Sequence, residues 1–308
     1  MGINFKKLNS QIKPLKPKSS KYGFIFIATD EQKRNFIDTI VTIGSKRRLV
    51  SFLVSLIKKM RIGTTNSNYK YMTIGIIVAM DKEYEAIVKA WLPNAPLSRN
   101  ERVVKGCRMI RLYPSEENEV VLVRSGIGKV NAAIATLELA SENVDCIISS
   151  GVAGGAASYL QPGQTIIGLH YHYHDVYCGK EVAKGQVQGE CEFFGADDKL
   201  IKIATSLQIE KCLAGAIVSG DQFVDSKQEM GRILDEFPFA IAVDMESCAI
   251  AQVCHKMEIP FISFRMLSDV VLNPAAKCYE DFWDKAPLQM ASNTMRFVMK
   301  VINEYKPF

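Results

Sequence analysis

The 308-residue sequence lacks the features of a secreted, zinc-binding or membrane-spanning protein. Its 8 cysteines are scattered, and none belongs to a Cys-x-x-Cys pair. This pattern argues against a zinc knuckle and a disulfide framework, and it favours a reducing, cytoplasmic environment. No apolar run approaches the roughly 18 residues that a membrane-spanning helix needs. The longest run, residues 49–57, is short and bracketed by Lys and Arg, so no membrane partner is expected.

Acidic residues are nearly absent from the first 71 positions, which contain 15 Lys+Arg and 3 Asp+Glu. Of the totals of 38 basic and 33 acidic residues, the remaining positions therefore hold 23 and 30, a net charge of −7. The overall charge of +5 is the sum of two pieces with opposite net charge, +12 and −7. The larger, acidic piece lacks the excess of Lys and Arg that is typical of nucleic-acid-binding domains, so no nucleic-acid partner is expected.

This change in composition predicts a basic N-terminal extension over residues 1–71 and one domain over 72–308. The extension could be a transit peptide or an amphipathic segment that lies on a membrane surface. The alternative is a loosely ordered extension outside the working protein. A methionine, Met72, stands where the composition changes and is followed directly by a strand pattern, so we favour this alternative.

From Met72 onwards, apolar β-rich runs alternate with helical patterns. This alternation predicts an α/β fold with three layers, α/β/α, around a central mixed, mainly parallel twisted sheet. The expected strands span residues 73–79, 107–113, 120–124, 145–149, 165–169, 171–176, 214–219, 240–243 and 260–266. The expected helices span residues 81–91, 128–142, 196–207, 226–235, 245–257 and 279–304.

Ligands of open α/β sheets bind beyond the carboxyl ends of the strands, and carboxylates recur at these predicted ends. Glu83, Glu246 and Asp269 each follow a different predicted strand. Each one alone could serve a helix N-terminus. Together they predict a site for a neutral or cationic reacting centre rather than a polyphosphate.

Other motifs have simpler interpretations. Gly126-Ile-Gly128 and Gly151-Val-Ala-Gly-Gly155 fit no nucleotide fingerprint, and each alone predicts a tight turn after a strand. His170, His172 and His174 share a strand face and could hold a metal, but no carboxylate or Cys at ligand spacing completes a set, so a structural or interface role is favoured. Cys254 and His255 lie late in an apolar helix, where core packing is expected.

Seven ordered motifs resemble those of the 5′-methylthioadenosine/S-adenosylhomocysteine nucleosidases, a family within the nucleoside phosphorylase superfamily. The resemblance covers nearly all of residues 72–308, and nothing before them. The motifs are Gly75-Ile-Ile-Val-Ala-Met-Asp-Lys-Glu83, Ser125-Gly-Ile-Gly-Lys-Val130, Gly151-Val-Ala-Gly-Gly155, Tyr173-His-Asp175, Ser219-Gly-Asp-Gln-Phe223, Val243-Asp-Met-Glu246 and Arg265-Met-Leu-Ser-Asp269.

The resemblance implies hydrolysis of the adenine–ribose bond of methylthioadenosine and S-adenosylhomocysteine, with 5′-deoxyadenosine as a further candidate, by a homodimer without metal or cofactor. Asp269 would protonate adenine at N7, Ser268 would help to hold it, and Glu83 would activate water. Glu246 would anchor the ribose hydroxyls. The remaining implied substrate-binding residues are Met245 against the sugar, Phe223 and Val224 at adenine, Ser125 and Arg265 near the water and ribose, Tyr279 at the 5′-thio side, and Met80 and Gly151.

Departures from the family pattern leave the 5′ substituent open. Residues 177–189 lack the aromatic and proline residues that many relatives bring there from the partner subunit, Val152 replaces a serine, and Asp244 replaces a glutamate. Three alternatives remain: a purine nucleoside phosphorylase, a hydrolase of an aminofutalosine-type nucleoside, and a non-catalytic nucleoside-binding protein. The loop with Asp81 and Glu83 lacks the arginine that phosphorylases typically place there, and retention of the three carboxylates argues against a non-catalytic protein.

Overall fold

The computed structural model describes residues 18–20, 23–25, 72–92, 101–115, 118–273 and 286–305. The chain divides into two compact units, Met1–Tyr69 and Lys70–Phe308. In the first unit, β1 (Lys18–Ser20) and β2 (Gly23–Ile25) pair antiparallel. The expectations about the role of residues 1–71 stay predictions.

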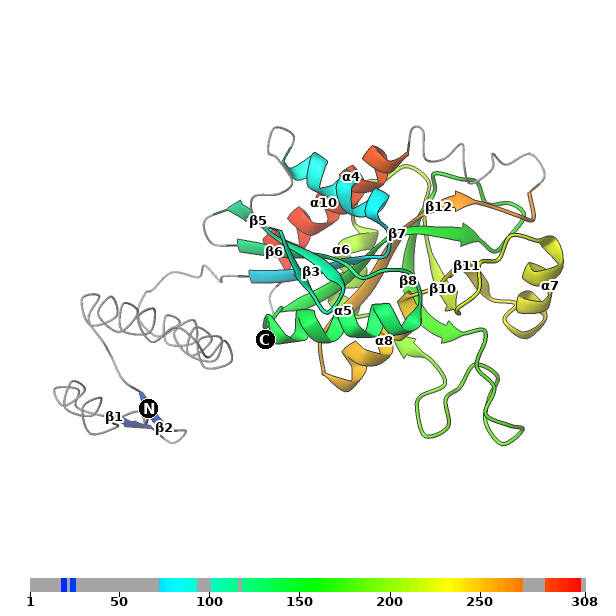
Figure 1. The fold of residues 1–308 in the computed structure, drawn as a ribbon, viewed down its shortest axis with the longest axis horizontal. Helices are drawn as coiled ribbons and strands as arrows, with labels where there is room; N and C mark the ends of the chain where they lie inside the picture. The colour runs from blue at the N-terminus through cyan, green and yellow to red at the C-terminus, as the bar shows by residue number, and fades with distance from the viewer. Residues whose placement is uncertain are drawn as a thin grey trace. The chain divides into compact units, whose positions relative to one another are not determined.

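The second unit contains a large mixed sheet with helices on both faces (Figure 1). Its strands are β3 (Met72–Val78), β4 (Arg102–Val104), β5 (Cys107–Ser115), β6 (Asn118–Arg124), β7 (Cys146–Gly155), β8 (Thr165–Tyr173), β9 (Phe194–Gly195), β10 (Cys212–Ser219), β11 (Ala240–Asp244) and β12 (Phe261–Asp269). Its helices are α4 (Asp81–Trp91), α5 (Lys129–Ser141), α6 (Asp198–Thr205), α7 (Lys227–Glu236), α8 (Ser247–Lys256) and α10 (Pro287–Glu304). The α/β class predicted from the alternation is confirmed.

The strand order is β11-β10-β8-β12-β7-β3-β6-β5-β4, with β9 beside β8. Strand β3 is parallel to both of its neighbours, β6 and β7, and β12 is parallel to β7. Strand β11 pairs with β10 and also antiparallel with the far end of β7, where Val243 faces Gly154. This side of the sheet therefore closes on itself, and it brings the ends of β7, β11 and β12 together.

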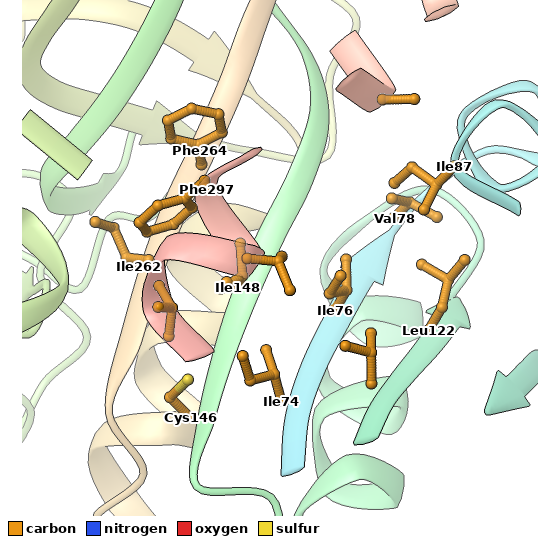
Figure 2. Close-up of a cluster of buried hydrophobic side chains, with 14 of the residues drawn as sticks. Ile74, Ile76, Val78, Ile87, Leu122, Cys146, Ile148, Ile262, Phe264 and Phe297 are labelled. Carbon is orange, nitrogen blue, oxygen red and sulfur yellow. The ribbon is translucent and has the colours of Figure 1, made fainter. Parts of the chain in front are cut away.

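Two apolar layers cover the two faces of the sheet. Helices α4, α6 and α10 pack over one face, and α5 and α8 over the other (Figure 1). Figure 2 shows the first layer, where side chains of β3, β7 and β12 meet α4 and α10. Phe264 of β12 stacks on Phe297 of α10, with ring centroids 4.7 Å apart. All seven residues of β3 are buried, as expected of a central strand covered on both sides.

Two sequence predictions about strands were wrong. Residues 165–169 and 171–176 were expected as separate strands, but β8 is one strand with an irregular register between Gly168 and His170 against β10. The segment Gly151 to Gly155 was expected as a turn, but β7 continues through it. Its backbone pairs there with β11 and β12, and such long-range pairing leaves no local signal.

The last predicted helix, residues 279–304, is described in its later part. Helix α10 begins at Pro287, a residue suited to the first helical turn because its missing N–H would lack an intrahelical partner. Residues 279–285 lie outside the described residues. No helix among the described residues is long and apolar enough to cross a membrane.

Candidate active site

A cavity of about 120 Å³ opens where the carboxyl ends of β3, β7, β11 and β12 meet. The described part of its lining combines apolar side chains with several carboxylates and one arginine. The lining residues are Ala79, Met80, Glu83, Ile127, Val152, Ala153, Gly154, Gln222, Phe223, Val224, Val243, Asp244, Met245, Glu246, Arg265, Ser268 and Asp269. The sheet edge predicted from the sequence is thus the edge that carries the cavity.

Glu83 is fully buried in the first turn of α4. Its Oε2 accepts hydrogen bonds from the backbone N–H groups of Ala79 and Met80, both at 2.9 Å. Its Oε1 accepts from the N–H of Val152, also at 2.9 Å. Burial raises the pKa of Glu83 above its ordinary value, while Arg265 and the backbone donors oppose that rise. The carboxylate is therefore fixed in direction and has enhanced basicity.

Gly151 makes room for this carboxylate. Its backbone has φ +127°, and a Cβ built there would come within 2.3 Å of Glu83 Oε1. A side chain at this position would be strained by the backbone and would collide with Glu83. Gly151 is not one of the cavity-lining residues in the described part of the chain, and it acts on the site by allowing this close approach.

Glu246 and Arg265 form a buried pair in the lining of the cavity, with Arg265 Nη2 3.4 Å from Glu246 Oε2. The other carboxylate oxygen accepts a hydrogen bond from the N–H of Gly128 at 3.0 Å. Burial raises the pKa of Glu246 to about 7, although Arg265 opposes the rise. Arg265 also donates to Val152 O at 3.0 Å and to Ser149 Oγ at 2.9 Å. The pair therefore has little freedom to reorient.

Asp269 is the last residue of β12, and it lines the same cavity as Glu246. Ser268 Oγ donates to Asp269 Oδ1 at 2.6 Å, and Ala153 O lies 3.3 Å from the same hydroxyl. A Cβ built at Gly154 would lie 3.6 Å from Asp269 Oδ2. The strand, rather than a loop after it, orients this carboxyl group.

The loop after β10 supplies the rim of the cavity. Phe223 is 58% exposed there, whereas Val224 is buried beside it. The predicted site did not include eight of the described residues that line the cavity, among them Gln222 and Ile127. The available signals were the position of Gln222 next to Phe223, and the position of Ile127 inside the Gly-Ile-Gly turn that precedes α5.

Besides Gly151, two residues expected at the substrate are not placed in the described lining. Ser125 is buried behind it, where its hydroxyl donates to Gly126 O at 2.7 Å and lies 3.2 Å from Val78 O. Main-chain carbonyls therefore engage this hydroxyl, and its role in binding stays a prediction. Tyr279 lies outside the described residues.

The histidines of β8 pack against aromatic rings. His170 Nδ1 lies 2.9 Å from His172 Nε2, and both rings contact Phe193 and Phe239. Within the described ranges, no group of three or more His, Cys, Asp or Glu side chains is arranged to hold a metal ion. Cys254 is buried in the core, as expected from its apolar helix.

The fold and the cavity define an α/β protein with a carboxylate-lined site, and comparison with known proteins gives the class. The model of the phosphorylase superfamily matches residues 73–303. The 5′-methylthioadenosine/S-adenosylhomocysteine nucleosidase of Bacillus cereus strain B4264 is 34% identical over 246 residues, which cover 76% of this chain and all of that relative. The chain belongs to the phosphorylase superfamily and, within it, to the 5′-methylthioadenosine/S-adenosylhomocysteine nucleosidase family.

Solved structures agree with this placement. The Neisseria meningitidis nucleosidase of the same name, in complex with methylthio-immucillin-A, has a TM-score of 0.65 and 32% identity, covering 75% of this chain and 98% of that one. The futalosine hydrolase of Helicobacter pylori has a TM-score of 0.66 and 25% identity, covering 76% and 98%. The fold is therefore shared by a methylthioadenosine/S-adenosylhomocysteine nucleosidase and a futalosine hydrolase.

Proposed function

We propose that this protein hydrolyses the adenine–ribose bond of 5′-methylthioadenosine and S-adenosylhomocysteine and releases adenine. The observation that carries the proposal is the convergence of Glu83, Glu246 and Asp269 on one cavity in a chain of this family. Each of the three carboxyl groups has a separate direction fixed by its own contacts. Three separately held carboxyl groups suit a reaction that needs an acid, a base and a sugar anchor.

Adenine departs poorly as an anion, so its protonation lowers the barrier. Asp269 is the proposed acid and donates a proton to N7. Ser268, whose hydroxyl lies 2.6 Å from Asp269 Oδ1, keeps the other oxygen turned to the base. Phe223 at the rim stacks on the adenine ring, and the backbone of Val224 binds its edge.

The sugar becomes oxocarbenium-like as the bond lengthens, and the charge of the cavity favours that cation. Glu83, Asp244, Glu246 and Asp269 line it together with Arg265, the one arginine in its described lining. Glu83 is the proposed base for the attacking water, because its pKa is raised. Glu246 binds the 2′ and 3′ hydroxyls, with Met245 and Met80 against the sugar. The site needs no metal or organic cofactor for these steps.

Phosphorolysis would require free cationic side chains for phosphate, and the described arginines near the cavity are engaged by carboxylates. Arg265 pairs with Asp244 and Glu246. After β3, Asp81 pairs with Arg108 at 2.5 Å and with Arg124 at 3.2 Å. A phosphate ion would have to displace these carboxylates, so water is the favoured nucleophile.

The decisive experiment is a substrate panel in the presence and absence of phosphate. We expect adenine release from methylthioadenosine and S-adenosylhomocysteine in phosphate-free buffer with a chelator present. A requirement for phosphate would identify a phosphorylase instead. Binding without turnover would identify a non-catalytic protein. Release of base from an aminofutalosine-type nucleoside alone would favour the second candidate, which the similarity to the futalosine hydrolase supports.

The proposed assembly is a homodimer through α5. Exposed apolar residues follow the solvent side of this helix at intervals of three and seven residues: Ile127, just before the helix, is 51% exposed, Val130 71% and Leu137 47%. Ile127 also lines the cavity. An apolar stripe of this spacing suits packing against another helix, and a second copy would cover the stripe and the cavity rim together.

The free thiols of the described cysteines fit the proposed cytoplasmic location.

A further inference from the structure

Helix α8 begins at an unusual residue. Glu246 occupies its N-cap, but the Glu246 side chain makes no capping hydrogen bond and lies in the cavity instead. The first N–H groups of a helix have no intrahelical partner and need an acceptor. Something else must therefore satisfy the start of α8 for Glu246 to remain available to a ligand.

Asp244, the last residue of β11, supplies that acceptor. Its Oδ1 accepts from the N–H of Glu246 at 3.3 Å and from the N–H of Ser247 at 3.2 Å. Its Oδ2 accepts from the hydroxyl of Ser247. Ser219 extends the arrangement: its hydroxyl donates to Asp244 Oδ1 at 2.5 Å and accepts from the N–H of Cys248 at 2.9 Å. The side chains of Asp244 and Ser219 thus accept the hydrogen bonds from the first N–H groups of α8 that an N-cap side chain would ordinarily accept.

The same carboxylate fixes the arginine of the site. Arg265 Nε lies 3.1 Å from Asp244 Oδ2, and both side chains are almost fully buried. The remaining edge of the guanidinium faces Glu246 Oε2 and Ser149 Oγ. Asp244 therefore contacts the backbone of Glu246 on one side and its cationic partner on the other.

We propose that Asp244 is a positioning residue, which caps α8 in place of Glu246 and holds Arg265, and by both contacts directs the Glu246 carboxylate to the ribose. The assignment of the ribose rests on the proposed function, whereas the effect on Glu246 itself does not. Asp244 stands where the resemblance to the family leads one to expect glutamate. The shorter side chain brings its carboxylate directly onto the N-terminus of α8.

The two contacts can be separated by substitution. Asp244→Asn keeps an oxygen that can accept from the start of α8, but its amide nitrogen cannot pair with Arg265. Asp244→Ala removes both contacts. Asp244→Glu keeps the charge. Asp197→Asn is the matched control, because Asp197 caps α6 by accepting from Lys199 N at 3.0 Å and from Leu200 N at 2.9 Å, away from the cavity.

The experiment compares the variants by kcat/KM for methylthioadenosine across pH and by the Kd of adenine, which has no ribose. For Asp244→Asn we expect kcat/KM to fall about tenfold, in the range of couplings between contacting residues, with the Kd of adenine within about twofold of the wild type. The negative charge of Asp244 helps to raise the pKa of Glu246. The acid limb of the kcat/KM profile should therefore lie at lower pH in Asp244→Asn than in the wild type. In Asp244→Glu, the acid limb should lie at the same pH as in the wild type.

A second measurement does not depend on the reaction. The carboxyl carbon of Glu246 can be followed by NMR during a pH titration, with its signal assigned by its loss in Glu246→Gln. We expect the Glu246 titration to shift to lower pH in Asp244→Asn and to be unchanged in Asp197→Asn. An unchanged titration, or an equal loss of adenine and substrate binding, would overturn the inference. A wild type that releases no adenine but shows the shifted titration would overturn the proposed function alone.

Discussion

The carboxylate of Glu83 lies against the backbone of Gly151, at a place where a Cβ would come within 2.3 Å of Oε1. Glu83 belongs to the first turn of α4 and Gly151 to the middle of β7. The proposed base is therefore held between a helix and a strand that are far apart in the sequence. The missing side chain of Gly151 therefore leaves room for the carboxylate of the proposed base.

Gly151→Ala should reduce kcat by about a hundredfold, because the methyl group displaces Glu83 from the position of the attacking water. The matched control is Gly163→Ala, which also has a positive φ, +86°, but no atom within 4 Å of the added Cβ. Both variants should lose some stability from the strained backbone. Steady-state kinetics with thermal melts separate the effects, and equal kcat values in the two variants would contradict the proposed contact.

Asp269→Asn should reduce the rate of adenine release by at least about a hundredfold, the usual scale of a general acid. Ser268→Ala should have a smaller effect, since it removes a hydrogen bond at 2.6 Å but leaves the acid. Single-turnover measurements in phosphate-free buffer isolate the bond-breaking step. A near-normal rate for Asp269→Asn would remove this residue from its assigned role.

Much of this site follows from residues next to strand ends, because parallel strands bring their carboxyl ends to one edge. Glu83, Glu246 and Asp269 were predicted on that ground, and the structure brings all three to the cavity. The contacts that direct them were not predictable. The bond from Val152 N to Glu83 joins residues separated by 69 positions, and the extension of β7 through Gly155 depends on pairing with β11. Neither the composition nor the local sequence pattern predicts contacts between residues so far apart in the chain.

The pH dependence should show a steep acid limb. Burial raises the pKa of Glu246 to about 7 and raises that of Glu83 above its ordinary value. Both act as carboxylates in the proposed mechanism, so protonation as the pH falls removes the base and the ribose anchor. We expect kcat/KM to decrease below about pH 7, more steeply than tenfold per pH unit as the second group protonates. A flat profile down to pH 5, with the protein still folded by circular dichroism, would contradict these roles.

Val130→Glu should separate the proposed dimer, because it places a charge in the apolar stripe of α5. Val103→Glu on β4 is the matched control, since both valines are 71% exposed. Sedimentation should give the wild type and Val103→Glu twice the chain mass of 34.4 kDa, and Val130→Glu a single chain mass. Because Ile127 lines the cavity next to this stripe, the separated variant should also lose activity. A monomeric wild type would contradict the assembly.

A version that starts at Met72 should retain the kcat/KM of the full chain. The described residues that line the cavity all come after this point, the family match begins at residue 73, and the first compact unit ends at Tyr69. The membrane-surface interpretation of residues 1–71, whose net charge is +12, predicts one difference: binding of the full chain to anionic vesicles at low salt, absent from the shorter version. Equal vesicle binding would remove the membrane-surface interpretation of the extension. A large loss of kcat/KM would show that these residues contribute to the enzyme.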